Sequence, residues 1–100
     1  MKFAVLFEDN PGSGAGMRAR HMPDHLAFLE RHAAKIDAAG PLTDADASGA
    51  GGLWIVTADD EAEVRQLVEQ DPFWLTGLRK SVRILSWMQV FADGERLIDV

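Results

Sequence analysis

A histidine and an aspartate stand where two predicted helices should carry apolar side chains. His25 shares a helical face with Leu29, and Asp71 continues the i, i+3, i+7 spacing that begins with Val64 and Leu67. An imidazole and a carboxylate are costly to bury unless they are paired. The sequence therefore predicts that His25 and Asp71 pair with each other.

Such a pair is suited to acid–base chemistry. Asp71 would hold one ring nitrogen of His25 and fix its tautomer, which leaves the other nitrogen to accept a proton from a carbon or hydroxyl acid. A positioned general base typically contributes about 10²- to 10⁴-fold to a rate. The alternative is a structural histidine that is hydrogen-bonded near the start of a helix.

Three further residues are predicted to contact a ligand. Phe73 and Trp74 follow the aspartate directly and could wall a pocket for a flat molecule, although aromatic side chains are more often part of a core. Arg20 belongs to a basic cluster with Arg18 and His21. We expect this cluster in a solvated loop, where it could also help to hold an anion.

We expect no metal and no cofactor. His21 precedes Pro23, and His32 lies two helical turns from His25, about 10 Å at 1.5 Å per residue, which is too far for a shared ion. The glycine-rich segment 10–16 lacks both the ending of a phosphate-binding loop and the spacing of a dinucleotide fingerprint, so we expect a connector or lid. The chain contains no cysteine, which excludes disulfides and thiolate catalysis.

Length and charge define the class of protein. The 100 residues fit one domain, 1–100, and 47% hydrophobic residues suffice for a small core. A net charge of −6 argues against nucleic acid or an anionic membrane as a partner. The apolar run that ends at Glu8 is too short for a signal peptide or a membrane span, so we expect a cytoplasmic protein.

Hydrophobic periodicity and turn residues predict the elements of the fold. The first half contains a strand over 2–8, a helix from near Pro23 to about Ala39 that Gly40-Pro41 ends, and a weak strand over 42–46. After a turn over 47–52, a strand follows over 53–57, and then a helix that Asp59 or Asp60 caps and that ends near Asp71. A connector over 73–77 leads to a strand over 82–91. Asp93-Gly94 predicts a hairpin turn that folds 96–100 back as an extra edge segment.

The order βαββαβ predicts an α+β fold, a ferredoxin-like plait with a four-stranded antiparallel sheet and both helices on one face. The two helices then run antiparallel, which brings His25 and Asp71 to the same edge of the domain. The strands over 2–8 and 53–57 are apolar on both faces, yet two helices cover only one face. We therefore expect a homodimer that packs the open faces together. The alternative is that the loop and the C-terminal segment shield this face.

Four short motifs follow one another along the chain: His25-Leu26, Ala39-Gly40-Pro41, Asp71-Pro72-Phe73 and Gly77-Leu78. Their order and spacing resemble the YciI-like (YCII-related) family, from the first strand through Trp87. The resemblance implies a dimeric α+β barrel, and the family's proposed functional histidine and aspartate correspond to His25 and Asp71. Family members often carry an arginine one helical turn before the histidine, where this chain has Met22.

The resemblance leaves the reaction open, because most members have no assigned activity. A few relatives act as cofactor-free lyases, isomerases or dechlorinating enzymes on small oxygenated rings. We therefore expect a small enzyme with His25 as base and Asp71 as its orienting partner, acting on a small oxygenated or cyclic molecule. The alternative is a non-catalytic module for ligand binding or dimerisation. A cavity beside an unpaired imidazole nitrogen would favour the enzyme.

Overall fold

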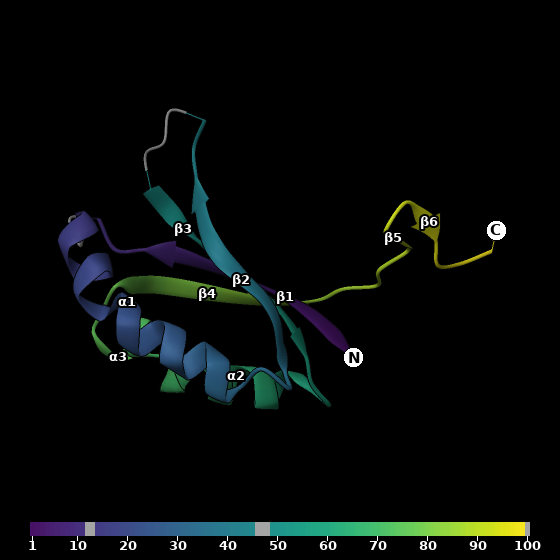
Figure 1. Cartoon of the computed structure of the whole chain (residues 1–100), viewed down its shortest axis with the longest axis horizontal. Helices are drawn as coiled ribbons and strands as arrows, with labels where there is room; N and C mark the ends of the chain where they lie inside the picture. The colour runs from purple at the N-terminus through teal and green to yellow at the C-terminus, as the bar shows by residue number, and fades with distance from the viewer. Residues whose placement is uncertain (12–13, 46–48, 100) are drawn as a thin grey trace.

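The computed structural model describes residues 1–11, 14–45 and 49–99, which form one four-stranded sheet with helices on one face (Figure 1). The elements are β1 (Lys2–Asp9), α1 (Gly14–Arg31), β2 (Ile36–Thr43), β3 (Gly49–Thr57), α2 (Glu61–Gln70), α3 (Pro72–Leu75), β4 (Arg79–Ser86), β5 (Phe91–Ala92) and β6 (Glu95–Arg96). The sheet order is β2-β3-β1-β4, with every neighbouring pair antiparallel. This arrangement confirms the predicted ferredoxin-like α+β fold.

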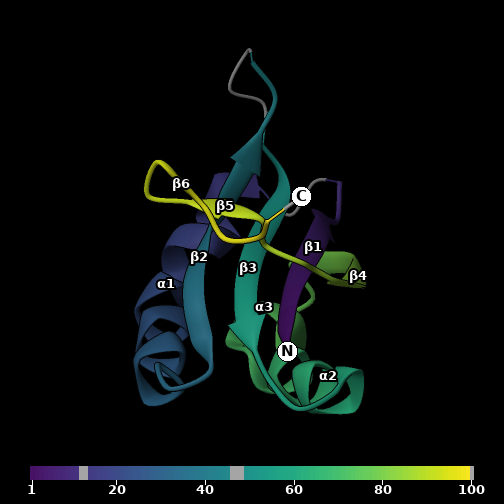
Figure 2. The ribbon, with the colours of Figure 1, turned by 90° about the vertical axis from the view of Figure 1, so that its right-hand side faces the viewer.

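Alternation along the central strands separates two faces of the sheet. Phe3, Val5 and Phe7 of β1 are buried, and Val5 pairs with Trp54 of β3 in the register. Figure 2 shows the strands β2, β3, β1 and β4 from left to right, with the helices together on one side of them. Apolar side chains on that side form the core: Phe3, Val5, Phe7, Phe28, Ile36, Trp54, Val56, Ala58, Val64, Leu67 and Val68. We call this the covered face, and the opposite one the open face.

The first helix differs from its predicted bounds. It begins at Gly14 instead of near Pro23, and it ends at Arg31 instead of Ala39. A proline inside a helix removes one backbone hydrogen bond, but it does not end the helix where the flanking turns are held by packing. The predicted loop over 10–16 is correspondingly shorter, because Gly14 and Gly16 belong to α1. Gly12 and Ser13 lie outside the described residues.

The segment after α1 is a strand where the sequence predicted the end of a helix. Gly40 and Pro41 lie inside β2, opposite Leu53 and Gly52 of β3. β2 is an edge strand, where a proline is tolerated because only one side of the strand is paired. The strand predicted over 42–46 therefore begins six residues earlier, at Ile36. Of the turn predicted over 47–52, residues 49–52 belong to β3 and the remainder lies outside the described residues.

The second helix has the predicted bounds. Asp60 is its N-cap and accepts a hydrogen bond from Glu63 N–H at 2.9 Å, while Glu63 accepts one from Asp59 N–H at 3.2 Å. The arrangement resembles a capping box, except that Glu63 reaches the N–H of the residue before the N-cap and not that of the N-cap itself. Asp71 ends the helix as its C-cap, and Pro72 begins the single helical turn α3 where a connector was predicted.

The C-terminal part departs from the predicted long strand. β4 ends at Ser86, and β5 and β6 form a separate two-stranded sheet instead of an added edge strand. The predicted turn is present, since Asp93 and Gly94 have φ values of 53° and 79°, which a type I′ hairpin turn requires. No helix in the described part of the chain is long and apolar enough to span a membrane.

Candidate functional site

His25 and Asp71 form a buried hydrogen-bonded pair. Nδ1 of His25, in the middle of α1, lies 2.7 Å from Oδ1 of Asp71, and the two residues are 6% and 0% exposed. The predicted contact between them is therefore present. The expected position of His25 at the start of a helix is wrong, because α1 begins eleven residues earlier, at Gly14.

The junction between α2 and α3 holds the carboxylate in place. Asp71 is the C-cap of α2 and the N-cap of α3, and its Oδ1 also accepts a hydrogen bond from Phe73 N–H at 3.1 Å. Pro72 at the first position of α3 has the fixed φ that a helix start requires. Oδ1 is thus fixed by two donors from different elements, whereas Oδ2 is buried with no partner among the described residues.

An aromatic wall supports the imidazole. The ring of Phe73 stacks on that of His25 with 4.0 Å between centroids and 15° between planes, and Trp54 lies 6.5 Å from the imidazole on another side. Both rings present flat surfaces that restrict the imidazole to one plane. His25 is therefore oriented by packing as well as by its carboxylate partner.

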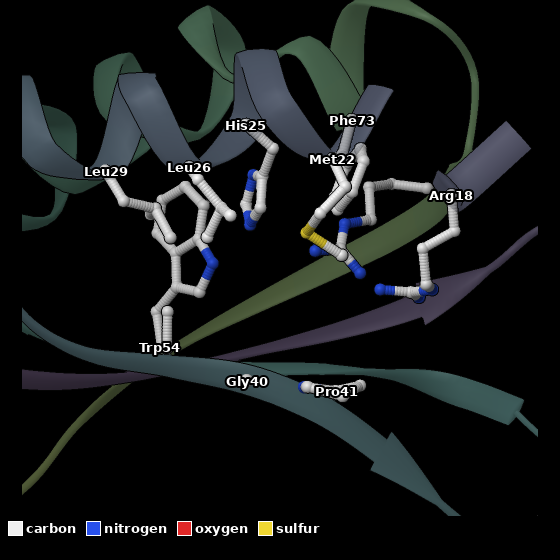
Figure 3. A pocket seen from close by; sticks show the side chains of 11 residues that line it. Arg18, Met22, His25, Leu26, Leu29, Gly40, Pro41, Trp54 and Phe73 are labelled. Atoms are coloured by element: carbon white, nitrogen blue, oxygen red, sulfur yellow. The ribbon is translucent and has the colours of Figure 1, made fainter. Parts of the chain in front are cut away.

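A small pocket opens beside this pair. Its volume is about 110 Å³, and Figure 3 shows the imidazole directed from α1 into the space above Gly40 of β2. The pocket is lined by Arg18, Met22, His25, Leu26, Leu29, Ala39, Gly40, Pro41, Trp54, Phe73 and Arg79. Nδ1 faces Asp71, and the described residues offer no hydrogen-bond partner to Nε2.

Two arginines give the pocket a cationic side. Arg79 Nη1 donates to Asp9 Oδ1 at 3.1 Å, and Arg18 Nη2 donates to Asp9 Oδ2 at 2.5 Å. The two guanidinium groups lie 5.2 and 5.4 Å from the ring centroid of Phe73. Two positive charges share one carboxylate here, so this side of the pocket favours an anionic group.

Burial shapes the chemistry of Arg79. Its guanidinium lies 4.3 Å from the centroid of Phe7, and desolvation lowers the pKa of Arg79, while the hydrogen bond and charge of Asp9 oppose this effect. Its Nε has no hydrogen-bond partner among the described residues. Gly52 makes room for the side chain, because a Cβ there would lie 3.0 Å from Nη1.

The structure brings only part of the predicted ligand set to the pocket. Phe73 lines it, whereas Arg20 and Trp74, both described, do not. The cluster of Arg18, Arg20 and His21, expected in a solvated loop, lies in α1. The described residues contain no group of three or more histidine or acidic side chains that could hold a metal ion.

From the basic cluster that could hold an anion, sequence reasoning chose Arg20 as the ligand-binding residue instead of Arg18, and it missed Arg79 entirely. Arg18 lies seven residues before His25, which places both on one helical face once the helix is known to begin before Arg18. No comparable local signal exists for Arg79, because Asp9, its partner, lies 70 residues away in the sequence.

Comparison with known proteins agrees with this architecture. A family model for the YCII-related domain matches residues 1–88. The chain is also similar to 5-chloro-2-hydroxyhydroquinone dehydrochlorinase from Burkholderia phenoliruptrix AC1100, solved in complex with 2,5-dihydroxybenzoquinone. The two sequences are 34% identical over 88% of this chain and 94% of that one, with a TM-score of 0.77. No curated protein sequence matches the chain.

Proposed function

The chain belongs to the YCII-related domain family, and from this premise we propose that it is a small-molecule enzyme in which His25 acts as a general base. The observation that carries the proposal is a buried His25–Asp71 pair at 2.7 Å whose imidazole borders a pocket. The 34% identical dehydrochlorinase is a small-molecule enzyme, which supports the same class of function here.

The hydrogen bond to Asp71 assigns a role to each ring nitrogen. With its proton on Nδ1, His25 donates to Asp71 Oδ1 and keeps the lone pair of Nε2 for the pocket. Asp71 also stabilises the imidazolium that forms when Nε2 takes a proton. Because Phe73 N–H and the Phe73 ring hold the two partners, the base is positioned before a substrate arrives.

The pocket fits a substrate with a single ring. A dry cavity of about 150 Å³ accommodates benzene in another protein, and the pocket here is smaller, about 110 Å³, so it has room for no more than one ring. Its apolar and aromatic walls suit a flat molecule, while Arg18 and Arg79 suit an oxygen that becomes negative. The similar enzyme was solved with 2,5-dihydroxybenzoquinone, a flat oxygenated ring. We propose a hydroxylated aromatic or quinol-type substrate.

The reaction that these groups support is an elimination. His25 Nε2 takes a proton from a ring hydroxyl, and the charge spreads over the ring towards the guanidinium groups of Arg18 and Arg79. The proton is returned to the ring carbon that bears the leaving group, so that this carbon becomes tetrahedral and the first oxygen becomes a carbonyl. His25 then takes a proton from a second hydroxyl, a leaving anion such as chloride departs from the tetrahedral carbon as the second carbonyl completes the quinone, and this second proton passes from His25 to water. The net change is loss of one HX from the substrate, as in a dehydrochlorination.

The alternative is that the pair is purely structural. Asp71 caps two helices, and both partners are almost fully buried, as a structural hydrogen bond requires. A structural pair should leave no cavity and no unpaired ring nitrogen beside it. The pocket at His25 therefore favours catalysis.

The test measures chloride release from 5-chloro-2-hydroxyhydroquinone and binding of 2,5-dihydroxybenzoquinone. His25→Asn keeps polarity and approximate size but removes the proton acceptor, so we expect turnover to fall by about 10²- to 10⁴-fold with little change in stability. His32→Asn is the matched control in the turn that follows the same helix, because His32 packs on Phe28 outside the pocket. We expect it to retain turnover.

Two outcomes would contradict the proposal. If His25→Asn lost about 1 to 3 kcal/mol of stability while quinone binding followed only the folded fraction, the pair would be structural. If the wild-type protein neither bound the quinone nor released chloride, the proposed substrate class would be wrong.

We propose in addition that the protein is a homodimer. The open face carries apolar side chains that are only partly buried in one chain, among them Ala4, Leu6, Leu53 and Ile55, with Leu85 exposed. Water on such a face is unfavourable, and a second copy related by a two-fold axis would cover it. Sedimentation equilibrium at micromolar concentration tests this, and a monomer would contradict it.

A further inference from the structure

The chain after β4 forms an arm, defined here as residues 87–99, that leaves the domain. It starts where Trp87 N–H donates to Lys2 O at 3.0 Å, and it contains the β5–β6 hairpin. Figure 1 shows this hairpin standing clear of the sheet and of the helices. The YCII-related family model ends at residue 88, so most of the arm lies beyond it.

The arm is apolar for a segment in solvent. Six of its large hydrophobic side chains are between 38% and 78% exposed, and these are Trp87, Met88, Val90, Phe91, Leu97 and Ile98. An isolated two-stranded hairpin is at best marginally stable in water, and contiguous apolar surface of this kind marks an interaction site. The arm therefore needs a surface that its own domain does not provide.

A matching surface lies on the open face. An apolar groove of about 160 Å³ runs between β2 and β3, lined by residues 38–42, Leu53 and Ile55. None of the arm residues described contributes to its lining. Each chain thus presents one apolar arm and one apolar groove that do not meet within the same chain.

Charge on the two surfaces is also complementary. Arg83 of β4 lies opposite Leu6 in the register, which places it on the open face, and it is exposed without an ion pair to any described residue. The arm carries Asp93, Glu95 and Asp99 against one cation, Arg96. Opposite charges of this kind orient partners and suppress wrong pairings.

We propose that two copies exchange their arms, so that the arm of each protomer lies in the apolar groove of the second copy. Two-fold exchange covers both arms and both grooves at once, and it brings the acidic arm onto the partner's open face, which carries Arg83 on β4 at its far edge. This inference rests on the proposed homodimer and is independent of the proposed catalysis.

Disulfide trapping tests the exchange directly, because the chain contains no cysteine. A Leu97→Cys protein is mixed with a Leu42→Cys protein and oxidised, since Leu97 belongs to the arm and Leu42 to the groove. We expect a covalent heterodimer on a non-reducing gel. Mixing Leu97→Cys with Leu75→Cys is the matched control, because Leu75 is exposed on α3, on the covered side, and should give none.

A second test uses substitutions that remove the apolar contacts of the arm and leave the folded core unchanged. Phe91→Asp combined with Leu97→Asp changes two exposed side chains, so circular dichroism should be unchanged, while the dimer dissociation constant rises by about tenfold or more. Leu75→Asp should leave the dimer intact.

Three other results would contradict the exchange of arms. If the wild-type protein is a dimer but the mixed cysteine variants do not cross-link and the arm variant dimerises normally, the exchange is wrong and the dimer stands. If one chain carrying both Leu97→Cys and Leu42→Cys closes an internal disulfide while the mixture gives none, the arm covers its own domain. A monomeric wild type would overturn the exchange and the dimer together.

Discussion

Neighbouring residues of β3 meet different surroundings on the two faces of the sheet. Trp54 and Val56 are 1% and 0% exposed beneath the helices, whereas Leu53 and Ile55 are only partly buried on the open face. The covered face also holds the pocket and its paired polar groups. The open face keeps its hydrogen-bonded polar cluster at one end, where Lys2, Asp37 and Thr57 meet.

This difference distinguishes the buried contacts that stabilise a single chain from the apolar surface that remains available to a partner. Burial beneath the helices is complete within a single protomer, so the His25–Asp71 pair forms without a second copy. The open face is apolar yet unfinished, which is typical of a surface that another chain covers. Identical substitutions at adjacent positions of β3 should therefore have different consequences.

The largest expected effect comes from placing a carboxylate on each face of β3. Val56→Asp puts an unpaired charge in the core and should cost at least about 4 kcal/mol, enough to unfold a small domain. Ile55→Asp should leave the protomer folded but dissociate the proposed dimer. Circular dichroism and sedimentation on both variants check this, and unfolding of the Ile55 variant would show that the two faces are not distinct.

Helical phase explains why the pair could be predicted from sequence. The spacing that aligns His25 with Leu29 and Asp71 with Val64 depends on residue period and not on where a helix starts or ends. The fold followed from the element order in the same way. The residue types and the helical phase of the pair therefore did not depend on the wrong bounds of the first helix, whereas the expected position of His25 at the start of that helix did.

Boundaries were less predictable because tertiary context overrides local turn signals. Pro23 suggested a helix start and Gly40-Pro41 a helix stop. In the structure Pro23 lies inside α1, and Pro41 lies in an edge strand, where proline is tolerated. The burial of Arg79 could not be predicted either. The cost of burying its guanidinium is compensated by a hydrogen bond to Asp9, which lies in a strand distant in sequence.

A smaller effect is expected at Gly52, beneath Arg79 on the covered face. Gly52→Ala places a methyl group 3.0 Å from Nη1, and we expect a loss of about 1 to 2 kcal/mol because the buried guanidinium must shift. Binding of 2,5-dihydroxybenzoquinone should weaken with it, since Arg79 lines the pocket. Urea unfolding measures the loss of stability, and titration with the quinone measures the change in its dissociation constant.

The matched control is an exposed glycine with free space around it. Gly16→Ala in α1 meets no atom within 4 Å and should leave stability unchanged or raise it by up to about 1 kcal/mol, because alanine favours a helix. Equal losses at the two positions would mean that the Gly52 effect reflects glycine in general and not the guanidinium above it.

The smallest effect concerns the polar end of the open face. A hydrogen bond from Lys2, with a second from Thr57, lowers the pKa of Asp37 from its ordinary value of 3.8. A carboxylate with a depressed pKa stabilises the folded state above the unfolded value, and this contribution is lost as the pH falls through the folded value. Since the Lys2–Asp37 pair is exposed to solvent, its contribution at pH 7 should stay below about 1 kcal/mol.

Asp37→Asn should therefore be slightly less stable than wild type at neutral pH, and the free energies of unfolding of the two proteins should converge as the pH falls below 3.8. Added salt should reduce the neutral-pH difference by screening. A difference that persists at acid pH would show that Asp37 acts through its shape and not its charge.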